Sequence, residues 1–120
     1  EAENEAPPVP QAHGQWRIVK MPRRLDATTV PDVTEKCLAM LDSQAFMVLD
    51  CTKLVFLTSA GLAMLAQLHR AAEEKEGALR VAACSEDVLR VIQMTRFDRF
   101  LALFDDVTSA AESLSYSPPA

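Results

Sequence analysis

The chain has 120 residues, 49% of them hydrophobic, and a formal net charge of −5 at pH 7. Its length predicts one domain that buries roughly 65% of its unfolded surface, which is enough for a core without disulfides or metals. The acidic balance argues against a nucleic-acid partner, because binding phosphates requires a basic surface that displaces counterions.

Three features of the sequence indicate the cellular compartment of the protein: its apolar runs, its N-terminus and its cysteines. No apolar run approaches the ~20 residues that span a bilayer, so we expect no direct membrane insertion. Residues 1–6 are acidic and lack the charged and apolar regions of a signal peptide. Cys37, Cys51 and Cys84 are widely spaced without a CxxC pair, which favours small core residues over a disulfide framework. These features predict a reduced, cytoplasmic protein.

Residues 1–14 are predicted to be a flexible tail, because prolines and glutamates prevail there and bulky side chains are few. The alternating stretch 16–21 predicts a first strand that ends at Pro22. Thr28 or Thr29 is expected to cap the next helix, with Pro31 in its first turn. Helical spacing predicts one buried face, formed by Val30, Val33, Cys37, Met40 and Leu41.

The short apolar run 46–49 predicts a central strand covered on both faces. The stretch 55–65 then changes from strand to helix, with Ser59 as the predicted N-cap and Gly61 allowing close backbone packing. The helix is expected from Ser59 to about Glu76, with Gly77 as its C-cap. His69 is interpreted as a packed, hydrogen-bonded residue beside the inner stripe of Leu62, Leu65, Leu68 and Ala72.

The last third of the chain repeats this alternation. Residues 79–84 predict a strand, and Ser85 is expected to cap a helix with Glu86 and Asp87 in its first turn. The predicted apolar face of that helix comprises Val88, Val91, Ile92 and Met94. Residues 101–104 predict a strand, and Asp105 or Asp106 is expected to cap a final helix with inward-facing Val107, Ala110, Ala111 and Leu114.

The order of these elements predicts the fold class. Strands that alternate with helices are typical of an α/β domain with a mainly parallel sheet. We therefore expect one domain over residues 15–115, with four to five strands and about four helices packed on them. Residues 116–120 are predicted to be a C-terminal tail.

The sequence offers little for catalysis. It lacks an HExxH motif, a metal-spaced cluster of Cys and His, a P-loop and a GxGxxG fingerprint. A Ser-His-Asp site is disfavoured, because Ser59 and His69 share one helix and lie on the order of 15 Å apart by helix rise. We expect a non-enzymatic protein without metal or cofactor. Two interpretations of Ser59 remain, a helix cap or a modifiable hydroxyl at a helix N-terminus.

Four segments in order carry a family resemblance. Leu49 and Asp50, followed by residues 55–62, resemble the signature of STAS domains, especially bacterial anti-sigma factor antagonists. Residues 24–27 resemble the Gly-x-Leu-Asp element of that family, although Arg23 takes the usual glycine position. Residues 92–100 resemble its Leu-Thr-Gly-Leu-Asp segment, with Arg96 in place of glycine, and Ala110 and Ala111 fit its closing helix.

The resemblance implies a STAS-like fold and regulation by exchange of partners. Family members bind an anti-sigma factor that is also a serine kinase, are inactivated when it phosphorylates them, and are restored by a serine phosphatase. In this sequence Ser59 takes the phosphoacceptor position, with Thr58 as second choice. The implied partner-binding residues are Asp26, Thr58, Ser59, Ala60, Gly61 and Leu62. Formation of a homodimer stays open.

Thr58 replaces the acidic residue that precedes the acceptor in the family, so the role of that carboxylate is missing. This departure suits an alternative, an accessory STAS subunit of a lipid-transport ATPase or of a signalling scaffold. In that case Ser59 serves only as a helix cap and is not phosphorylated. A small hydrolase is a distant third hypothesis.

Overall fold

The computed structural model describes residues 17–115, and both predicted tails lie outside this range. Four parallel strands form the main sheet in the order β1-β3-β5-β6. Their bounds are β1 (Arg17–Lys20), β3 (Phe46–Asp50), β5 (Ala78–Ala82) and β6 (Ala102–Phe104). Two short strands, β2 (Arg24–Leu25) and β4 (Phe56–Leu57), pair in parallel as a separate small sheet. The predicted α/β class with a mainly parallel sheet is confirmed.

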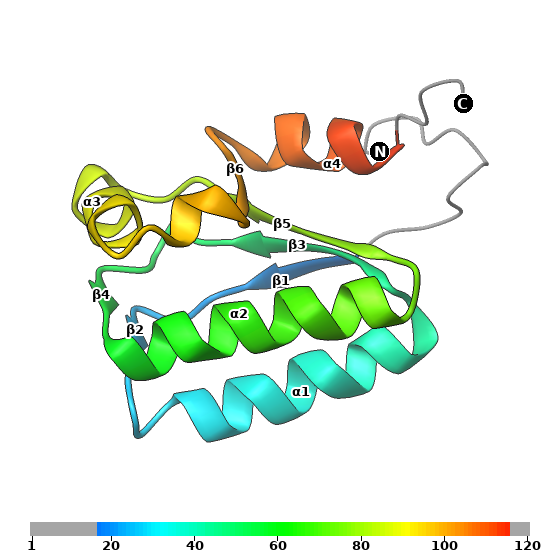
Figure 1. The fold of residues 1–120 in the computed structure, drawn as a ribbon, viewed down its shortest axis with the longest axis horizontal. Coiled ribbons are helices and arrows are strands. Elements are labelled where there is room, and N and C mark those ends of the chain that lie inside the picture. The colour runs from blue at the N-terminus through cyan, green and yellow to red at the C-terminus, as the bar shows by residue number, and fades with distance from the viewer. Residues whose placement is uncertain (1–16, 116–120) are drawn as a thin grey trace.

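Four α-helices pack around the main sheet. Their bounds are α1 (Val30–Ser43), α2 (Ser59–Glu74), α3 (Glu86–Met94) and α4 (Val107–Ser115), with a short 3-10 helix, η2 (Phe97–Arg99), after α3. α1 and α2 lie side by side on one face, and α4 lies on the other (Figure 1). α3, β2 and β4 gather at one end of the sheet. Within the described residues, none of the helices combines the length and apolar character needed to cross a membrane.

The core consists of two layers of unequal size. The predicted central strand β3 supplies both, since Met47 and Leu49 join the cluster under α1 and α2 while Val48 joins the cluster under α4. The first cluster also contains the predicted stripe of α2, Leu62, Leu65, Leu68 and Ala72. Among the described side chains, the buried members of the cluster under α4 are Val48, Ala82, Ala110 and Ala111. The prediction of a strand covered on both faces is confirmed.

Several helix ends differ from the sequence prediction. Thr29 is the N-cap residue of α1, but its hydroxyl makes no capping bond and instead donates to the Arg24 carbonyl at 2.8 Å. α2 ends at Glu74, and Glu76 rather than Gly77 takes the left-handed conformation, with a φ of 62°. Gly77 is needed because a Cβ there would clash with the carbonyl oxygen of Ala45. Proximity to β3 therefore explains this glycine.

The ends of α3 and the start of α4 complete the comparison. Ser85 caps α3 as predicted, accepting from the Val88 N–H at 3.2 Å. Met94 is not part of the inner face, because it is the last residue of α3 and is 75% exposed. Arg96 then takes a left-handed φ of 66°, a conformation that glycine adopts without strain. Of the two predicted caps of α4, Asp106 accepts from the Ser109 N–H at 2.7 Å; the side chain of Leu114 lies outside the described part.

Candidate functional site

The small β2–β4 sheet brings together two segments that are 32 positions apart in the chain. Arg24 pairs with Phe56 and Leu25 with Leu57. The N–H groups of Val55 and Phe56 donate to the Arg23 carbonyl at 2.8 and 3.0 Å. Backbone pairing therefore places the Arg-Leu-Asp segment directly beside the start of α2.

Thr58 continues this pairing and sets the start of α2. Its N–H and its hydroxyl both donate to the Leu25 carbonyl, at 3.1 and 2.9 Å. Its own carbonyl accepts from the Leu62 N–H at 2.9 Å, so Thr58 is the N-cap residue. The prediction that Ser59 is the N-cap is wrong, because Thr58 takes that position and the helix begins at Ser59, one residue earlier than a Ser59 cap requires.

Ser59 is consequently the first residue of α2 and is exposed. Within residues 17–115 its hydroxyl has no hydrogen-bond partner. The first turn of α2 carries no acidic side chain, and its N–H groups point out of the helix end without intrahelical acceptors. This end of the helix can therefore accept an anionic group at Ser59.

Gly61 and Leu62 pack the first turn of α2, which carries Ser59, against the rest of the protein. A Cβ on Gly61 would lie 2.6 Å from Leu57 Cδ1 and 2.8 Å from the Leu25 carbonyl oxygen. The missing side chain therefore lets α2 approach the small sheet, as the sequence indicated. Leu62 is buried in the core, and Ala60 is half-buried. Of these predicted partner-binding residues, Ser59 offers the most exposed side chain.

Asp26 follows β2 and is occupied by local hydrogen bonds. Its carboxylate accepts from the N–H and hydroxyl of Thr28 at 3.0 and 2.6 Å, from the Thr29 N–H at 3.2 Å, and from Arg24 Nε at 3.1 Å. The Thr28 hydroxyl bond and the Arg24 bond hold the pKa of Asp26 well below its usual range. The carboxylate thus holds the turn that precedes α1, and no described side chain caps the first turn of this helix.

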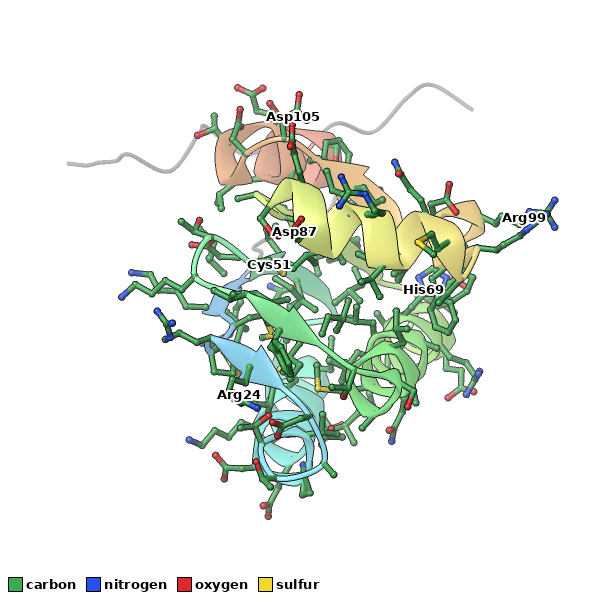
Figure 2. The ribbon with its side chains drawn as sticks, turned by 90° about the vertical axis from the view of Figure 1, so that its left-hand side faces the viewer. Arg24, Cys51, His69, Asp87, Arg99 and Asp105 are labelled. Atoms are coloured by element: carbon green, nitrogen blue, oxygen red, sulfur yellow. The ribbon has the colours of Figure 1, made fainter. Side chains whose placement is uncertain are left out.

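An exposed apolar surface lies next to Ser59. Val55, just before β4, is 56% exposed, and Phe56, the first residue of β4, is 50% exposed. The Arg24 guanidinium lies 4.6 Å from the centroid of the Phe56 ring, and Arg23 beside it is exposed. In Figure 2, β4 faces the viewer with β2 and the labelled Arg24 alongside. We call these four residues, Arg23, Arg24, Val55 and Phe56, the β4 ridge.

Sequence reasoning missed this ridge. Val55 and Phe56 belong to an apolar run at the end of an expected strand, a pattern that gave no sign of their exposure. The strand is two residues long and pairs with a single neighbour, so within residues 17–115 no layer covers the outer side of β4. The two consecutive arginines opposite it were the available signal, but only the pairing of β2 with β4 connects them to Phe56.

His69 lies away from Ser59, further along α2. Its Nε2 is 3.4 Å from Glu73 Oε2, and its ring lies 5.4 Å from that of Phe100. These contacts confirm that His69 is packed, but the predicted hydrogen bonding is not found at its buried Nδ1, which has no partner within residues 17–115. In the described part of the chain, no group of three or more His, Cys, Asp or Glu side chains is arranged to hold a metal ion.

A model of the STAS domain matches residues 7–110, which is most of the chain. The chain belongs to the STAS domain family. Among curated protein sequences no match was found. The resemblance drawn from four short segments is therefore confirmed at the level of the family.

Solved structures share the fold. An anti-sigma factor antagonist from Mycobacterium paratuberculosis is 28% identical over 81% of this chain and 83% of its own, with a TM-score of 0.70. The anti-sigma factor antagonist SpoIIAA of Bacillus, solved in unphosphorylated and phosphorylated forms, is 14% identical in the first form. The match to the unphosphorylated form covers 84% of this chain and 90% of the SpoIIAA chain, with a TM-score of 0.69. A sulfate transporter family protein from Wolinella succinogenes is 17% identical over 90% and 91%, with a TM-score of 0.67.

Proposed function

We propose that this STAS domain is an anti-sigma factor antagonist that binds an anti-sigma factor with serine kinase activity. In this proposal the kinase phosphorylates Ser59 and releases the domain, and a serine phosphatase restores it. The observation that carries the proposal is the exposed, unbonded Ser59 hydroxyl at the first position of α2, beside the exposed β4 ridge. The 28% identical antagonist from Mycobacterium paratuberculosis supports the partner class.

The local contacts favour Ser59 over Thr58 as the acceptor. The Thr58 hydroxyl is half-buried and donates to the Leu25 carbonyl at 2.9 Å, so a phosphate there would break the junction between β2 and α2. A phosphate on Ser59 would meet the N-terminal N–H groups of the helix instead. The fold would therefore tolerate the modification at Ser59 and not at Thr58.

The same phosphate would act strongly on a bound partner. It adds ~1.5–2 negative charges to a surface that a partner buries in neutral form. Burying an unpaired charge costs several kcal/mol, and each ~1.4 kcal/mol changes affinity tenfold. A thousandfold loss of affinity, sufficient for partner exchange, is the expected order of magnitude.

The test uses the purified chain, ATP and each serine-kinase anti-sigma factor encoded in the same genome. We expect one of them to bind the chain and to transfer phosphate to it, with Ser59 identified by phosphopeptide mapping. Ser59→Ala should abolish incorporation while retaining binding. Thr58→Val is the matched control and should still be phosphorylated. Absence of both binding and phosphate transfer with every candidate kinase would contradict the proposal.

The second candidate is an accessory STAS subunit of a lipid-transport ATPase or signalling scaffold. Thr58 favours it, because the carboxylate expected before the acceptor is absent. In that case the chain should co-purify with an ATPase or scaffold protein and carry no phosphate. Ser59→Asp should then leave the association unchanged, which separates this candidate from the first.

A further inference from the structure

Two cysteines lie at the carboxyl ends of neighbouring parallel strands. Cys51 directly follows β3, and Cys84 lies two residues beyond β5. The strands pair with Asp50 opposite Ala82, and the Cys51 N–H donates to the Ala82 carbonyl at 2.8 Å. The Cys51 thiol donates to the Leu49 carbonyl at 3.8 Å and lies beside the Cys84 thiol across this junction. The fold thus brings together two thiols that are 33 positions apart.

The two thiols differ in environment. Cys51 is fully buried, whereas Cys84 is half-buried and therefore within reach of a small solute. The interaction with the Cys84 thiol, burial and the nearby charge of Asp50 raise the pKa of Cys51. The same interaction lowers the pKa of Cys84, against the effect of burial. Cys84 also directly precedes Ser85, the N-cap of α3, where the helix dipole favours a thiolate.

We propose that Cys84 and Cys51 form a modification site for hydroperoxides, which closes to an intramolecular disulfide. The Cys84 thiolate attacks one peroxide oxygen, the O–O bond breaks, and the departing hydroxide takes a proton to become water. The resulting sulfenic acid on Cys84 is then attacked by the Cys51 sulfur, which loses its proton as the S–O bond breaks and a second water leaves. Two thiols and one hydrogen peroxide give one disulfide and two waters.

The bond would join two segments of functional interest. Cys51 begins the connection that leads through β4 to Ser59, and Cys84 leads into α3, which contacts β4. Figure 2 labels Cys51 and, in the first turn of α3, Asp87. The disulfide would therefore fasten the support of the β4 ridge, but the thiol reaction itself does not depend on the proposed function.

The experiment treats the reduced full-length chain with hydrogen peroxide, quenches it, and blocks the remaining thiols with N-ethylmaleimide under denaturing conditions. The reduced chain carries three cysteines and should take up three adducts. After oxidation we expect one adduct and a crosslinked peptide that joins Cys51 to Cys84. The mass of the chain without its adduct should be lower by 2 Da, because two hydrogens are lost. A dithiol reductant should restore three adducts.

Cys37 provides the matched control, because it is buried and burial raises its pKa to about 11. Cys37→Ser should leave the loss of two thiols unchanged, and Cys84→Ser should abolish it. Cys51→Ser should stop the reaction at a sulfenic acid on Cys84, which dimedone traps. Any of three results with the wild-type chain would overturn the proposal: three adducts after peroxide treatment, a disulfide to Cys37, or a disulfide only between molecules. All three are read from the wild-type chain, so none depends on the folding of a variant.

Discussion

The starts of α2 and α3 have the same layout in the sequence, yet the structure uses them differently. Each follows a strand and carries a serine at the junction. Ser85 caps α3 through the Val88 N–H, and Glu86 and Asp87 follow in its first turn. Ser59 lies one position further into its helix, makes no such bond, and is followed by Ala60 and Gly61. One helix start is closed by its own side chains, and the other stays open to an added anion.

The largest expected effect comes from placing a charge at the open helix start. Ser59→Asp should weaken binding of the anti-sigma factor partner by roughly hundredfold or more, because a carboxylate would be buried unpaired at the interface. Titration calorimetry with the purified partner measures this. Ser85→Asp adds the same charge at the closed start and should bind normally. Equal losses for both variants would remove the functional distinction between the two sites.

The next effect concerns the glycine that only the open start possesses. Gly61→Ala should lower the free energy of unfolding by about 1–3 kcal/mol, because its Cβ would overlap Leu57 and Leu25. Urea denaturation gives this value. Ala63→Ser, at an exposed position of the same helix, should change it by less than about 0.5 kcal/mol. A stabilising effect of Gly61→Ala would show that α2 does not pack tightly on the small sheet.

Alanine at each serine tests the capping difference directly. Ser85→Ala should cost about 1 kcal/mol of stability through the lost bond to Val88. Ser59→Ala should stay within about 0.5 kcal/mol of wild type, because its hydroxyl caps nothing. Urea denaturation of the two variants side by side decides the matter. A larger loss of stability for Ser59→Ala than for Ser85→Ala would show that Ser59 caps α2 after all, as the sequence predicted.

The turn before α1 extends the comparison to a side chain that titrates. The folded-state pKa of Asp26 is depressed by its bonds to Thr28 and Arg24. Its contribution to stability is therefore present above its unfolded pKa of about 3.9 and is lost progressively as the pH falls below that value. Asp26→Asn should be less stable than wild type at pH 7, with a smaller difference at pH 3. Denaturation midpoints at both pH values test this, and a constant difference would contradict it.

Local patterns predicted the elements well because their causes are local. Periodicity located the stripe of α2, and the Ser-Glu-Asp sequence located the cap of α3. The features that failed depend on pairings across the chain. Thr58 replaces Ser59 as N-cap through its bonds to Leu25, Phe56 is exposed because β2 is the only described strand that pairs with β4, and Gly77 is required by Ala45. The contact of Cys51 with Cys84 likewise follows from strand order, which spacing alone does not specify.

The unequal core layers have a consequence for motion. In the described part of the chain, the fully buried residues under α4 are three alanines and one valine, joined by partly buried residues such as Phe46 and Phe104, whereas α2 is embedded in the large cluster. Segments with little buried apolar surface open at a lower free energy than the molecule as a whole. Amide hydrogen exchange should therefore reach α4 well before α2. The surface around Ser59 would keep its structure while α4 transiently detaches from the opposite face of the sheet.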